Sequence, residues 1–556
     1  MASRPARVAM LEQFKADGVK YMFGNPGTVE QGFLDELRGF PEIEYVLALQ
    51  EAVVVGIADG YARATRTPTL LQLHSGVGLG NGIGMLYQAM RGHAPLVVVV
   101  GESGLAYDSM DAQMAADLVG MAKPVTKWAT RVVDPESTLR VLRRAFKVAA
   151  TPPYGPVLVV LPADVLDLPT SEPAVPTSYL HTAVAPDDET VGLAATLLAD
   201  AERPLIIAGD GVHFAGAQAE LARFAEAWGA EVWGADWAEV NLPADHPLYQ
   251  GQLGHMFGEN SSRVTAAADA VLIVGTYALP EVYPLLGGVF AEGAPVVHID
   301  LDSGAIAKNF PVDLGLVADP KLSLGRLADA LTRRQSAEQR EAVAGRIQRF
   351  ADRKAAAYAE AVAHDLAADD GGPLTAAYFG RELSRQLPSD AVLFDEALTS
   401  SPGLFRYNPP NQPGHWHQTR GGSLGVGIPG AIGAKLAHPE RTVVGFTGDG
   451  GSMYTIQGLW TAARYDIAAK FVICNNGRYK LLDDNIEQYW RSQDIAHHDF
   501  PDLFDLSRPE IDFAALSESL GVPAVRVEKP EEVAPAIARA LAHPGPFLID
   551  LVIGRD

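Results

Sequence analysis

One stretch of the chain, residues 443–479, constrains the fold more than any other. A short run of β-branched and aromatic residues at 443–447 ends in the turn GDGG at 448–451. Glycines let the backbone approach a ligand closely, and a helix that starts at such a turn presents free N–H groups to an anion. A helical pattern at 456–465 then leads to a second buried run at 470–474. The stretch therefore predicts a strand, an anion-binding turn, a helix and a second strand parallel to the first.

A second polar turn, Asn475-Asn476-Gly477, follows this second run. If both strands end at one edge of a parallel sheet, Asp449 and Asn476 lie side by side although they are 27 positions apart. Two oxygen-bearing side chains beside a diphosphate suit Mg²⁺, which prefers octahedral oxygen ligation completed by phosphate and water. A GDGG segment alone is most often an ordinary turn, but the matched strand and the paired asparagines favour a diphosphate and magnesium site.

The two turns at this spacing resemble the signature of thiamine diphosphate enzymes. The flanking segments LWTAARY and NNGRY resemble the branch that contains benzoylformate decarboxylase and acetolactate synthase. The resemblance covers essentially the whole chain, and it implies thiamine diphosphate and Mg²⁺ as cofactors. It implies that the metal is held by Asp449, Asn476 and the backbone carbonyl of Arg478. The cofactor-binding residues that it implies are Glu51, Glu396, Thr399, Ser423, Leu424, Gly448, Asp449, Gly450, Gly451, Ser452, Asn476 and Tyr479.

Composition narrows the class of protein. A chain of 556 residues is long enough for about two to four globular domains. Its net charge of −24 argues against nucleic acid or an anionic membrane as the main partner. Cys474, the single cysteine, lies in an apolar run and is expected to be an inert core thiol. No apolar run reaches the ~18 residues of a membrane span, and the N-terminal segment has the pattern of an amphipathic helix rather than a secretory signal. We therefore expect a soluble, cytoplasmic protein.

Helical and strand patterns alternate along the whole chain, which predicts an α/β protein of three doubly wound parallel-sheet domains. The expected domains are residues 1–180, 187–345 and 370–556. A linker rich in Pro and Thr at 168–186 separates the first two, and a charged, alanine-rich helix at 337–370 connects the last two. Strands are expected at 21–23, 44–48, 69–73, 95–101, 157–161, 204–209, 271–275, 296–301 and 391–394, and helices at 8–17, 52–65 and 376–387.

The resemblance assigns a task to each domain. In the family, the first domain binds the aminopyrimidine of the cofactor, the third binds its diphosphate, and the central domain is mainly structural. A cofactor that bridges two domains needs them to face each other, and the family achieves this between subunits. We therefore expect a homodimer or homotetramer with active sites at the subunit interface.

Glu51 follows the run LALQ and precedes a helix rich in small residues, in which Gly56 and Gly60 allow close packing. A glutamate at a strand end is usually a solvated carboxylate. However, residues 44–65 resemble the activating-glutamate motif of the family, in which a carboxyl bonded to the pyrimidine promotes removal of the thiazolium proton. Burial in an apolar setting is expected to keep such a carboxyl partly protonated.

His74 and Thr28 each follow a predicted strand of the first domain, on the edge where ligands of open α/β sheets bind. The segment LHS around His74 matches an active-site histidine of benzoylformate decarboxylase, and an imidazole can shuttle protons near neutral pH. The alternative for His74 is a hydrogen-bonded structural role. Thr28 stands where the family has serine, so the hydroxyl is kept and a methyl group is added. The expected catalytic residues are thus Glu51, His74 and Thr28.

The third domain carries a candidate wedge, Leu424, 25 residues before Asp449. By the family pattern this leucine bends the cofactor into its V-shape. The chain also departs from the pattern. Benzoylformate decarboxylase has a second catalytic histidine in its central domain, whereas this chain has none between His255 and His298. Residues 415–420, HWHQTR, replace mainly aromatic and small residues, so we expect an altered substrate pocket.

Three further features remain open from sequence. Arg420 suits either a second acidic group on a substrate or a structural ion pair. Residues 481–504 are expected to form a helix and a loop that cover the site as a lid. His497 and His498 are expected to face solvent in this loop, and we assign them no catalysis.

The reaction that the resemblance implies is non-oxidative decarboxylation of a 2-oxo acid to an aldehyde through an enamine bound to the cofactor. Carboligation or acyloin cleavage, of acetolactate synthase or benzaldehyde lyase type, is the alternative within this class. A catalytically idle cofactor-binding subunit and a flavin-dependent oxidase also remain open. The joint presence of Glu51, Asp449 and Asn476 argues against the idle subunit.

Overall fold

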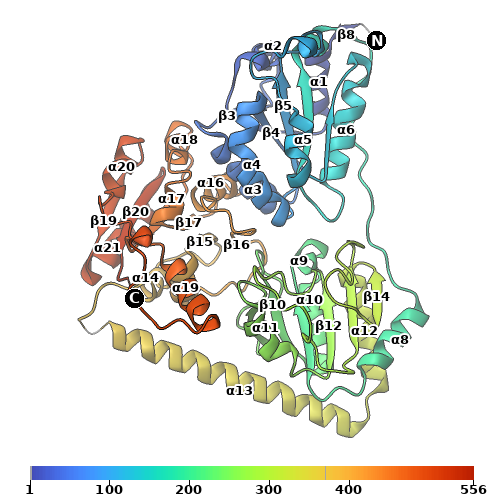
Figure 1. The fold of residues 1–556 in the computed structure, drawn as a ribbon, viewed down its shortest axis with the longest axis vertical. Coiled ribbons are helices and arrows are strands. Elements are labelled where there is room, and N and C mark those ends of the chain that lie inside the picture. Colours follow the sequence, from blue (N-terminus) through green and yellow to red (C-terminus); the bar gives the residue numbers. More distant parts are fainter. Residues whose placement is uncertain (1–2, 370, 556) are drawn as a thin grey trace. The chain divides into compact units, whose positions relative to one another are not determined.

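The computed structural model describes residues 3–369 and 371–555 (Figure 1). Its contacts group them into two compact units. The first unit holds the residues up to 180, residues 371–408 and those from 419 onward; the second holds 181–369 and 409–418. Three mainly parallel sheets with helices confirm the expected α/β class of doubly wound domains. The expected boundary at residue 370 and the chain ends at 1 and 556 lie outside the described residues.

The first sheet is formed by the N-terminal part of the first unit. Its strands are β2 (Tyr21–Gly24), β3 (Glu44–Leu47), β4 (Thr69–His74), β5 (Leu96–Glu102), β6 (Trp128–Arg131) and β7 (Val157–Pro162). Its helices are α1 (Ala6–Ala16), α2 (Gln31–Glu36), α3 (Glu51–Thr65), α4 (Ser75–Arg91), α5 (Leu118–Ala122), α6 (Thr138–Ala149) and α7 (Ala163–Asp167). The first and last segments of this part of the chain, β1 (Arg4–Pro5) and β8 (Pro169–Thr170), pair as a two-stranded antiparallel ribbon.

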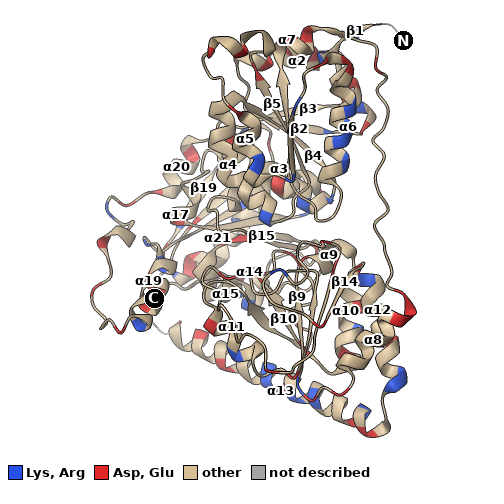
Figure 2. Ribbon diagram, turned by 45° about the vertical axis from the view of Figure 1, so that its right-hand side comes forward, with Lys and Arg blue, Asp and Glu red and all other residues tan. Residues whose placement is uncertain are grey.

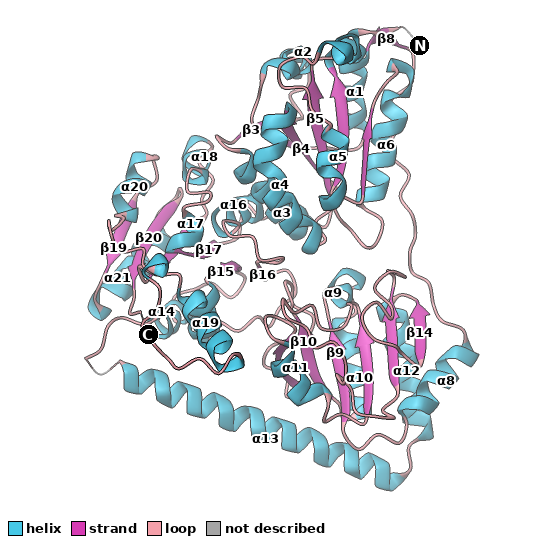
Figure 3. Cartoon of the chain, in the orientation of Figure 1, coloured by secondary structure: helices cyan, strands magenta, loops and turns pink. Residues whose placement is uncertain are grey.

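Helices cover both faces of this sheet because its strands are apolar on both sides. The strand order is β3-β2-β4-β5-β7-β6, and every pairing is parallel. Along β5, Val98 and Val100 pack with residues of α3 and α4, whereas Val97 and Val99 pack with residues of α1 and α6. Figure 3 shows these helices on the two sides of the strands. Near-continuous apolar runs are what a doubly covered parallel sheet requires.

The second unit has its own sheet, in the order β11-β10-β9-β12-β13-β14, again with parallel pairings. Its strands are β9 (Pro204–Ala208), β10 (Glu231–Ala235), β11 (Tyr249–Leu253), β12 (Ala270–Val274), β13 (Val296–Asp300) and β14 (Leu314–Val317). Its helices are α8 (Asp188–Leu198), α9 (Gly211–Ala215), α10 (Gln218–Trp228), α11 (Gly258–Thr265), α12 (Pro320–Arg334) and α13 (Ala337–Ala368). The contacts also group β16 (Trp416–Gln418) with this unit.

The charged helix that the sequence predicts at 337–370 is α13, 32 residues long. It begins with a capping box in which Ser336 and Gln339 satisfy each other's backbone N–H groups. Basic and acidic residues are both distributed along it (Figure 2), as expected of a helix that is largely exposed to water. Arg346 ties it to the end of α10 by donating to the carbonyls of Trp228 and Gly229.

The third sheet belongs to the C-terminal part of the first unit, where β15, β17, β18, β20 and β19 lie side by side in that order. Its strands are β15 (Val392–Glu396), β17 (Val443–Gly448), β18 (Lys470–Asn475), β19 (Ala524–Val527) and β20 (Phe547–Val552). Its helices are α14 (Ala376–Ser384), α15 (Ser401–Tyr407), α16 (Gly427–Ala437), α17 (Asp449–Ser452), α18 (Gly458–Arg464), α19 (Lys480–Ser492), α20 (Phe513–Ser519) and α21 (Pro530–Ala542). In register, Glu396 pairs with Thr447, and Gly448 pairs with Cys474, so three strands end at one edge.

The expected helix at 456–465 is shorter in the structure, where α17 forms one turn and α18 begins at Gly458. Residues 455–459 form turns instead, because the amides of Gly458 and Leu459 donate to the carbonyls three residues before them, those of Thr455 and Ile456. The strands β6, β10, β11, β14, β19 and β20 were not among those expected. Several of them, such as β11 (YQGQL), mix polar and apolar residues and lack a clear strand pattern.

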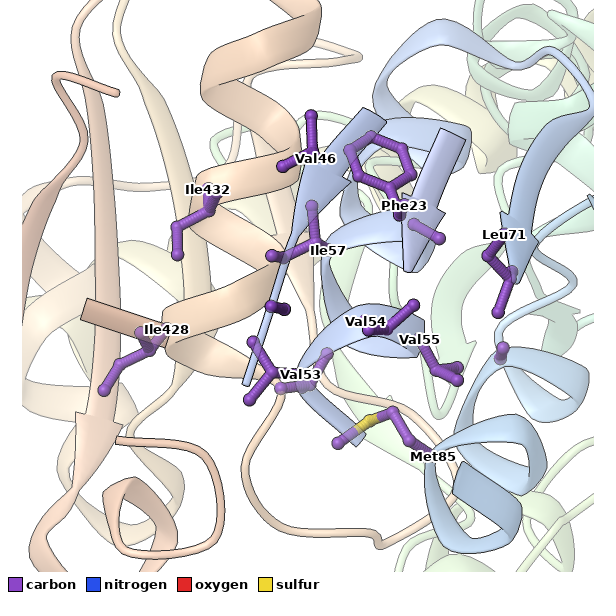
Figure 4. Packing of buried hydrophobic residues seen from close by; sticks show 14 of the residues in the cluster. Phe23, Val46, Val53, Val54, Val55, Ile57, Leu71, Met85, Ile428 and Ile432 are labelled. Carbon is purple, nitrogen blue, oxygen red and sulfur yellow. The ribbon is translucent and has the colours of Figure 1, made fainter. Parts of the chain in front are cut away.

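Within the first unit, α3 and α16 pack closely together (Figure 4). A Cβ at Gly56 would lie 2.6 Å from Pro429 Cγ, and a Cβ at Gly60 would lie 2.1 Å from Gly430 O. The prediction that the two glycines allow close packing is therefore confirmed. This contact joins the helix that begins at Glu51 to the helix that follows the Leu424 turn.

None of the helices in the described part of the chain has a stretch that is both long and apolar enough to cross a membrane.

Candidate functional site

The GDGG turn lies at the carboxyl end of β17. Asp449 begins α17 and is 6% exposed. A Cβ at Gly450 would lie 2.2 Å from Tyr479 Cε1, so only glycine lets the backbone approach this ring. Apart from the chain neighbours of Gly448, no atom of the described residues lies within 4 Å of the position that its Cβ would occupy, which leaves open space beside the turn.

The carboxylate of Asp449 is only half satisfied. Its Oδ1 accepts a hydrogen bond of 2.7 Å from the Gly450 amide. Its Oδ2 is buried and has no hydrogen-bond partner among the described residues. Burial raises the pKa of this carboxyl, and the amides of Gly450 and of residues 476–478 partly offset the shift. A buried, unpaired carboxylate oxygen is costly unless a cation or another donor meets it.

The polar turn after β18 supplies the neighbouring oxygens. Asn476 Oδ1 accepts a hydrogen bond of 3.0 Å from the Arg478 amide. Gly477 takes the left-handed conformation, with φ +63°, that turns the chain here. The Arg478 guanidinium forms a bidentate pair with Asp483 of α19, at 2.5 and 2.7 Å, which raises its pKa. The side chain of Arg478 is thus anchored while its backbone stays in the turn.

A second GDG, at residues 209–211 in the second unit, has different hydrogen-bond partners. There Asp210 accepts hydrogen bonds from the amides of Ala238 and Glu239 and from the Asn241 side chain. Its turn is tied to Gly275, because the Gly211 amide donates to that carbonyl at 2.9 Å. The unpaired oxygen of Asp449 therefore comes from its surroundings and not from the tripeptide.

A pocket of about 350 Å³ opens beside these two turns. All of its lining residues come from positions 396–482, so none comes from the first 180 residues. Cys474 also lines it, and burial raises the pKa of its thiol to about 12, in agreement with the expected inert cysteine. The expected cofactor and metal residues in the lining are Glu396, Thr399, Leu424, Gly448, Asp449, Gly450, Gly451, Asn476, Arg478 and Tyr479.

Besides Glu51, which belongs to the first sheet, two expected cofactor-binding residues lie outside this lining. The buried Ser452 donates a hydrogen bond of 2.7 Å from its hydroxyl to the Asp449 carbonyl, which stabilises the turn. Ser423 lies toward α4, with its Oγ 4.0 Å from the position of a Cβ on Gly84. Both residues flank the pocket.

Glu396, at the end of β15, holds the turn that carries Leu424. Its two carboxylate oxygens accept hydrogen bonds from the amides of Gly425 and Gly427, the second at 2.5 Å. Burial raises the pKa of this carboxyl to about 7. Because the carboxylate fixes the backbone on both sides of Val426, it keeps Leu424 at the mouth of the pocket.

The donor set beside the pocket suits a divalent cation. Asp449 Oδ2 is an unpaired carboxylate oxygen, Asn476 Oδ1 has a second lone pair, and the turn offers backbone carbonyls. Hard cations of this kind bind oxygen ligands, and a diphosphate would complete the coordination. The residues therefore fit a metal-bound diphosphate.

The first sheet places Glu51 in a different cluster. Glu51 begins α3 and is 6% exposed. Its carboxylate accepts hydrogen bonds from Asn25 at 3.1 Å and from Asn81 at 3.0 Å. The setting is thus more polar than the apolar one expected. Neither asparagine was among the expected site residues. For Asn81 a signal was available, because it shares one face of α4 with Gly78 and Gly82 at helical spacing.

His74 lies next to this carboxylate. A Cβ at Gly78 would lie 3.1 Å from Glu51 Oε1 and 3.2 Å from His74 Cβ. The imidazole Nδ1 is 2.8 Å from Glu30 Oε2. Glu30 was not among the expected site residues, although its position two residues after Thr28 was an available signal. Thr28 is exposed and lines a separate pocket of about 300 Å³.

None of residues 415–420, where we expect an altered substrate pocket, is in the lining of the pocket beside Asp449. His417 is fully buried, with Nδ1 2.8 Å from Glu239 Oε2 in the second unit, and Trp416 is 5% exposed. A histidine–carboxylate contact that water cannot reach is a packing element. Arg420 is partly buried, with its Cβ 3.7 Å from the position of a Cβ on Gly92, and does not line the pocket.

The predicted lid begins with α19, whose Leu481 and Leu482 line the pocket. His497 and His498 are exposed, as expected. Their rings pack on Trp490, with centroids 5.5 and 4.2 Å away. These contacts hold the loop that follows the helix against α19.

Family models match most of the chain. The N-terminal, central and C-terminal domains of thiamine pyrophosphate enzymes match residues 6–121, 191–327 and 399–551. The chain is 30% identical to benzoylformate decarboxylase of Pseudomonas aeruginosa over 554 residues, which cover 98% of each chain. It is 27% identical to the acetolactate synthase large subunit of Lactococcus lactis subsp. lactis, with 98% of this chain and 92% of the relative covered.

Solved structures agree with these relatives. The thiamine diphosphate-dependent 4-hydroxybenzoylformate decarboxylase of Rhodococcus jostii RHA1 superposes with a TM-score of 0.85 at 27% identity, over all of both chains. Benzoylformate decarboxylase of Polynucleobacter necessarius gives 0.84 at 25% identity, over 100% of this chain and 99% of that one. The chain therefore belongs to the thiamine diphosphate-dependent enzymes, in the branch of 2-oxo acid decarboxylases and related carbon–carbon lyases and ligases that includes benzoylformate decarboxylase and acetolactate synthase.

Proposed function

We propose that the chain is a Mg²⁺-dependent enzyme that decarboxylates a 2-oxo acid to an aldehyde without oxidation. The observation that carries the metal assignment is the buried, unpaired Asp449 Oδ2 beside Asn476 in the wall of the pocket. The decarboxylase assignment is supported by the end-to-end similarity to benzoylformate decarboxylases.

In this proposal, Asp449, Asn476 and the Arg478 carbonyl hold Mg²⁺, which carries the diphosphate. Gly450 and Tyr479 form the wall along it, and Thr399 lines the same pocket. Leu424, on the turn that Glu396 holds, would pack against the cofactor in this pocket.

When bound, thiamine diphosphate supplies an electron sink for the electrons that remain as CO₂ leaves. Asn25 and Asn81 hold the Glu51 carboxyl in place, where it would donate or accept a proton beside the pyrimidine. His74 Nε2 exchanges a proton with the reacting substrate, and the Thr28 hydroxyl orients it.

A second copy of the chain completes each site in this proposal, as a homodimer or homotetramer. The pocket lining around Asp449 contains no residue of the first 180, so Glu51 and His74 do not reach it within one chain. Large apolar side chains are exposed beside both clusters: Leu49 and Val77 near Glu51, and Tyr454 near Asp449. Burying such surface favours association.

The test is to incubate the purified protein with thiamine diphosphate, Mg²⁺ and a panel of aliphatic and aromatic 2-oxo acids, following CO₂ and aldehyde. Equal release of both supports the decarboxylase, and the preferred acid describes the pocket. Asp449→Ala provides a control that lacks the metal ligand. Absence of turnover for every acid, although the cofactor binds, would contradict the proposal.

Carboligation of acetolactate synthase type is the second candidate, favoured by the nearly full-length similarity to acetolactate synthase subunits. This reaction predicts CO₂ release without a matching amount of aldehyde, because a second carbonyl compound takes up the fragment that would otherwise leave as aldehyde. Adding an aldehyde or a second 2-oxo acid as acceptor and identifying the hydroxyketone separates the two reactions.

A further inference from the structure

A carboxylate is buried directly behind His74. Glu30 closes the short 3-10 helix at Thr28–Glu30 and is 0% exposed, whereas the His74 side chain keeps 14% of its exposure. Glu30 Oε2 lies 2.8 Å from His74 Nδ1. Among the hydrogen bonds of the described residues, none uses His74 Nε2, so this nitrogen is the one left for a ligand.

Two glycines allow the His74 ring and the Glu30 carboxyl to lie directly against the backbone. A Cβ at Gly27 would lie 2.0 Å from His74 Nδ1, so the ring lies directly against this backbone. A Cβ at Gly101 would lie 2.3 Å from Glu30 Oε1, so the carboxyl lies against the backbone at the end of strand β5. The ring and the carboxyl are therefore each confined by a backbone that tolerates no side chain.

Before Nε2 takes up a proton, the pair holds one proton, which lies between Nδ1 and the carboxylate. Burial raises the pKa of Glu30, and the nearby imidazole acts in the opposite direction. With the carboxylate ionised and Nδ1–H donated to it, Nε2 carries a lone pair and the pair has a charge of −1. After Nε2 gains a proton, the net charge is zero. A lone imidazole at the same place would instead become a cation, which burial disfavours.

We propose that Glu30 is a positioning residue for His74: it fixes the Nδ1–H tautomer and makes Nε2 the atom that exchanges the proton. This rests on the proposed function, in which His74 is the acid/base. When Nε2 donates its proton to the substrate, the pair passes from net zero to −1 while Nδ1–H stays bound to Glu30. Solvent then returns the proton to Nε2, so the cycle balances. Paired groups of this kind orient an imidazole and fix its tautomer.

The chain contains a matched control. Glu239 and His417 show the same contact, Nδ1 to Oε2 at 2.8 Å, with both side chains 1% exposed and outside the proposed site. The experiment compares Glu30→Gln, Glu30→Asp and Glu239→Gln with the unchanged protein. Each is labelled with ¹⁵N-histidine, and the His74 signal is assigned by its loss in His74→Gln. Spectra of the cofactor-free protein report the tautomer, and kcat and KM are measured with cofactor, Mg²⁺ and the preferred 2-oxo acid.

The expected result is one tautomer of His74, protonated at Nδ1, in the unchanged protein and in Glu239→Gln. Glu30→Gln should give a mixture of tautomers and lower kcat by roughly 10²-fold, with KM changed by less than about 3-fold. Glu30→Asp keeps the charge and should recover part of both effects. If Glu30→Gln does not fold, the Asp variant decides by showing an intermediate tautomer population and kcat.

An unchanged tautomer in Glu30→Gln, or an equal loss of kcat in Glu239→Gln, would overturn the proposal. If no 2-oxo acid is turned over by the unchanged protein, the proposed function fails. The tautomer spectra still decide the role of Glu30 in that case.

Discussion

Gly60→Ala tests the close contact between α3 and α16 on which the geometry of both clusters depends. The added Cβ would lie 2.1 Å from Gly430 O, whereas the closest ordinary C···O contacts are about 3.3 Å. The helices must therefore separate by roughly 1.2 Å. The displaced surface includes Val53, Ile57 and Ile432, all fully buried.

The cost follows from opposing effects. Overpacking costs about 1–3 kcal/mol, and a gap of about 1 Å forfeits up to half of the local dispersion energy. Alanine in place of glycine returns about 1 kcal/mol through helix propensity. We expect a net loss of about 2 kcal/mol in the free energy of unfolding.

The assay is urea unfolding followed by far-UV circular dichroism, with hydrogen–deuterium exchange of the peptides from α3 and α16. Gly345→Ala in α13 is the matched control, because its nearest atom is the flexible Arg349 Nη1 at 3.6 Å. That change should leave stability equal or raise it by about 0.5–1 kcal/mol. If Gly60→Ala is as stable as Gly345→Ala and exchanges no faster in α3 and α16, the inferred packing is wrong.

Three further predictions concern the site itself. Asp449→Ala should abolish Mg²⁺-dependent binding of thiamine diphosphate in a calorimetric titration, and undiminished binding would remove the metal assignment. Glu51→Gln should lower kcat by roughly 10²–10⁴-fold while the cofactor still binds, since it removes the proton-transferring carboxyl; normal turnover would contradict the activation mechanism. The pKa of Glu396 is about 7 when folded, above its usual value of 4.5, so the folded protein holds a proton that the unfolded chain releases between these values. Stability should therefore fall as pH rises through this window, by at most about 1.4 kcal/mol per pH unit from this group, and Glu396→Gln should flatten the slope in urea titrations at pH 5 to 7.

The sequence by itself determined the class of fold and the edge of the sheet at which the GDGG turn lies. Continuous apolar runs alternating with helices specify doubly covered parallel strands, and such strands bring the turns that follow them to one edge. The GDGG and Asn-Asn turns are local features, so their spacing along the chain was enough to predict a shared site. Gly56 and Gly60 also predicted a close helix contact, because small residues four positions apart on one face of a helix let another helix approach its backbone.

Only the tertiary structure decided which polar groups are satisfied. Two GDG turns look alike in sequence, yet Asp210 is saturated by donors from residues 238–241 and Asp449 keeps an oxygen unpaired. Likewise His74 and His417 both contact a glutamate, but the His74 ring is partly exposed, whereas the His417 ring is buried. The partners come from distant segments, and local propensity carries no information about distance in space. The sequence therefore indicated where chemistry is possible, and the packing of remote residues determined which groups remain free to perform it.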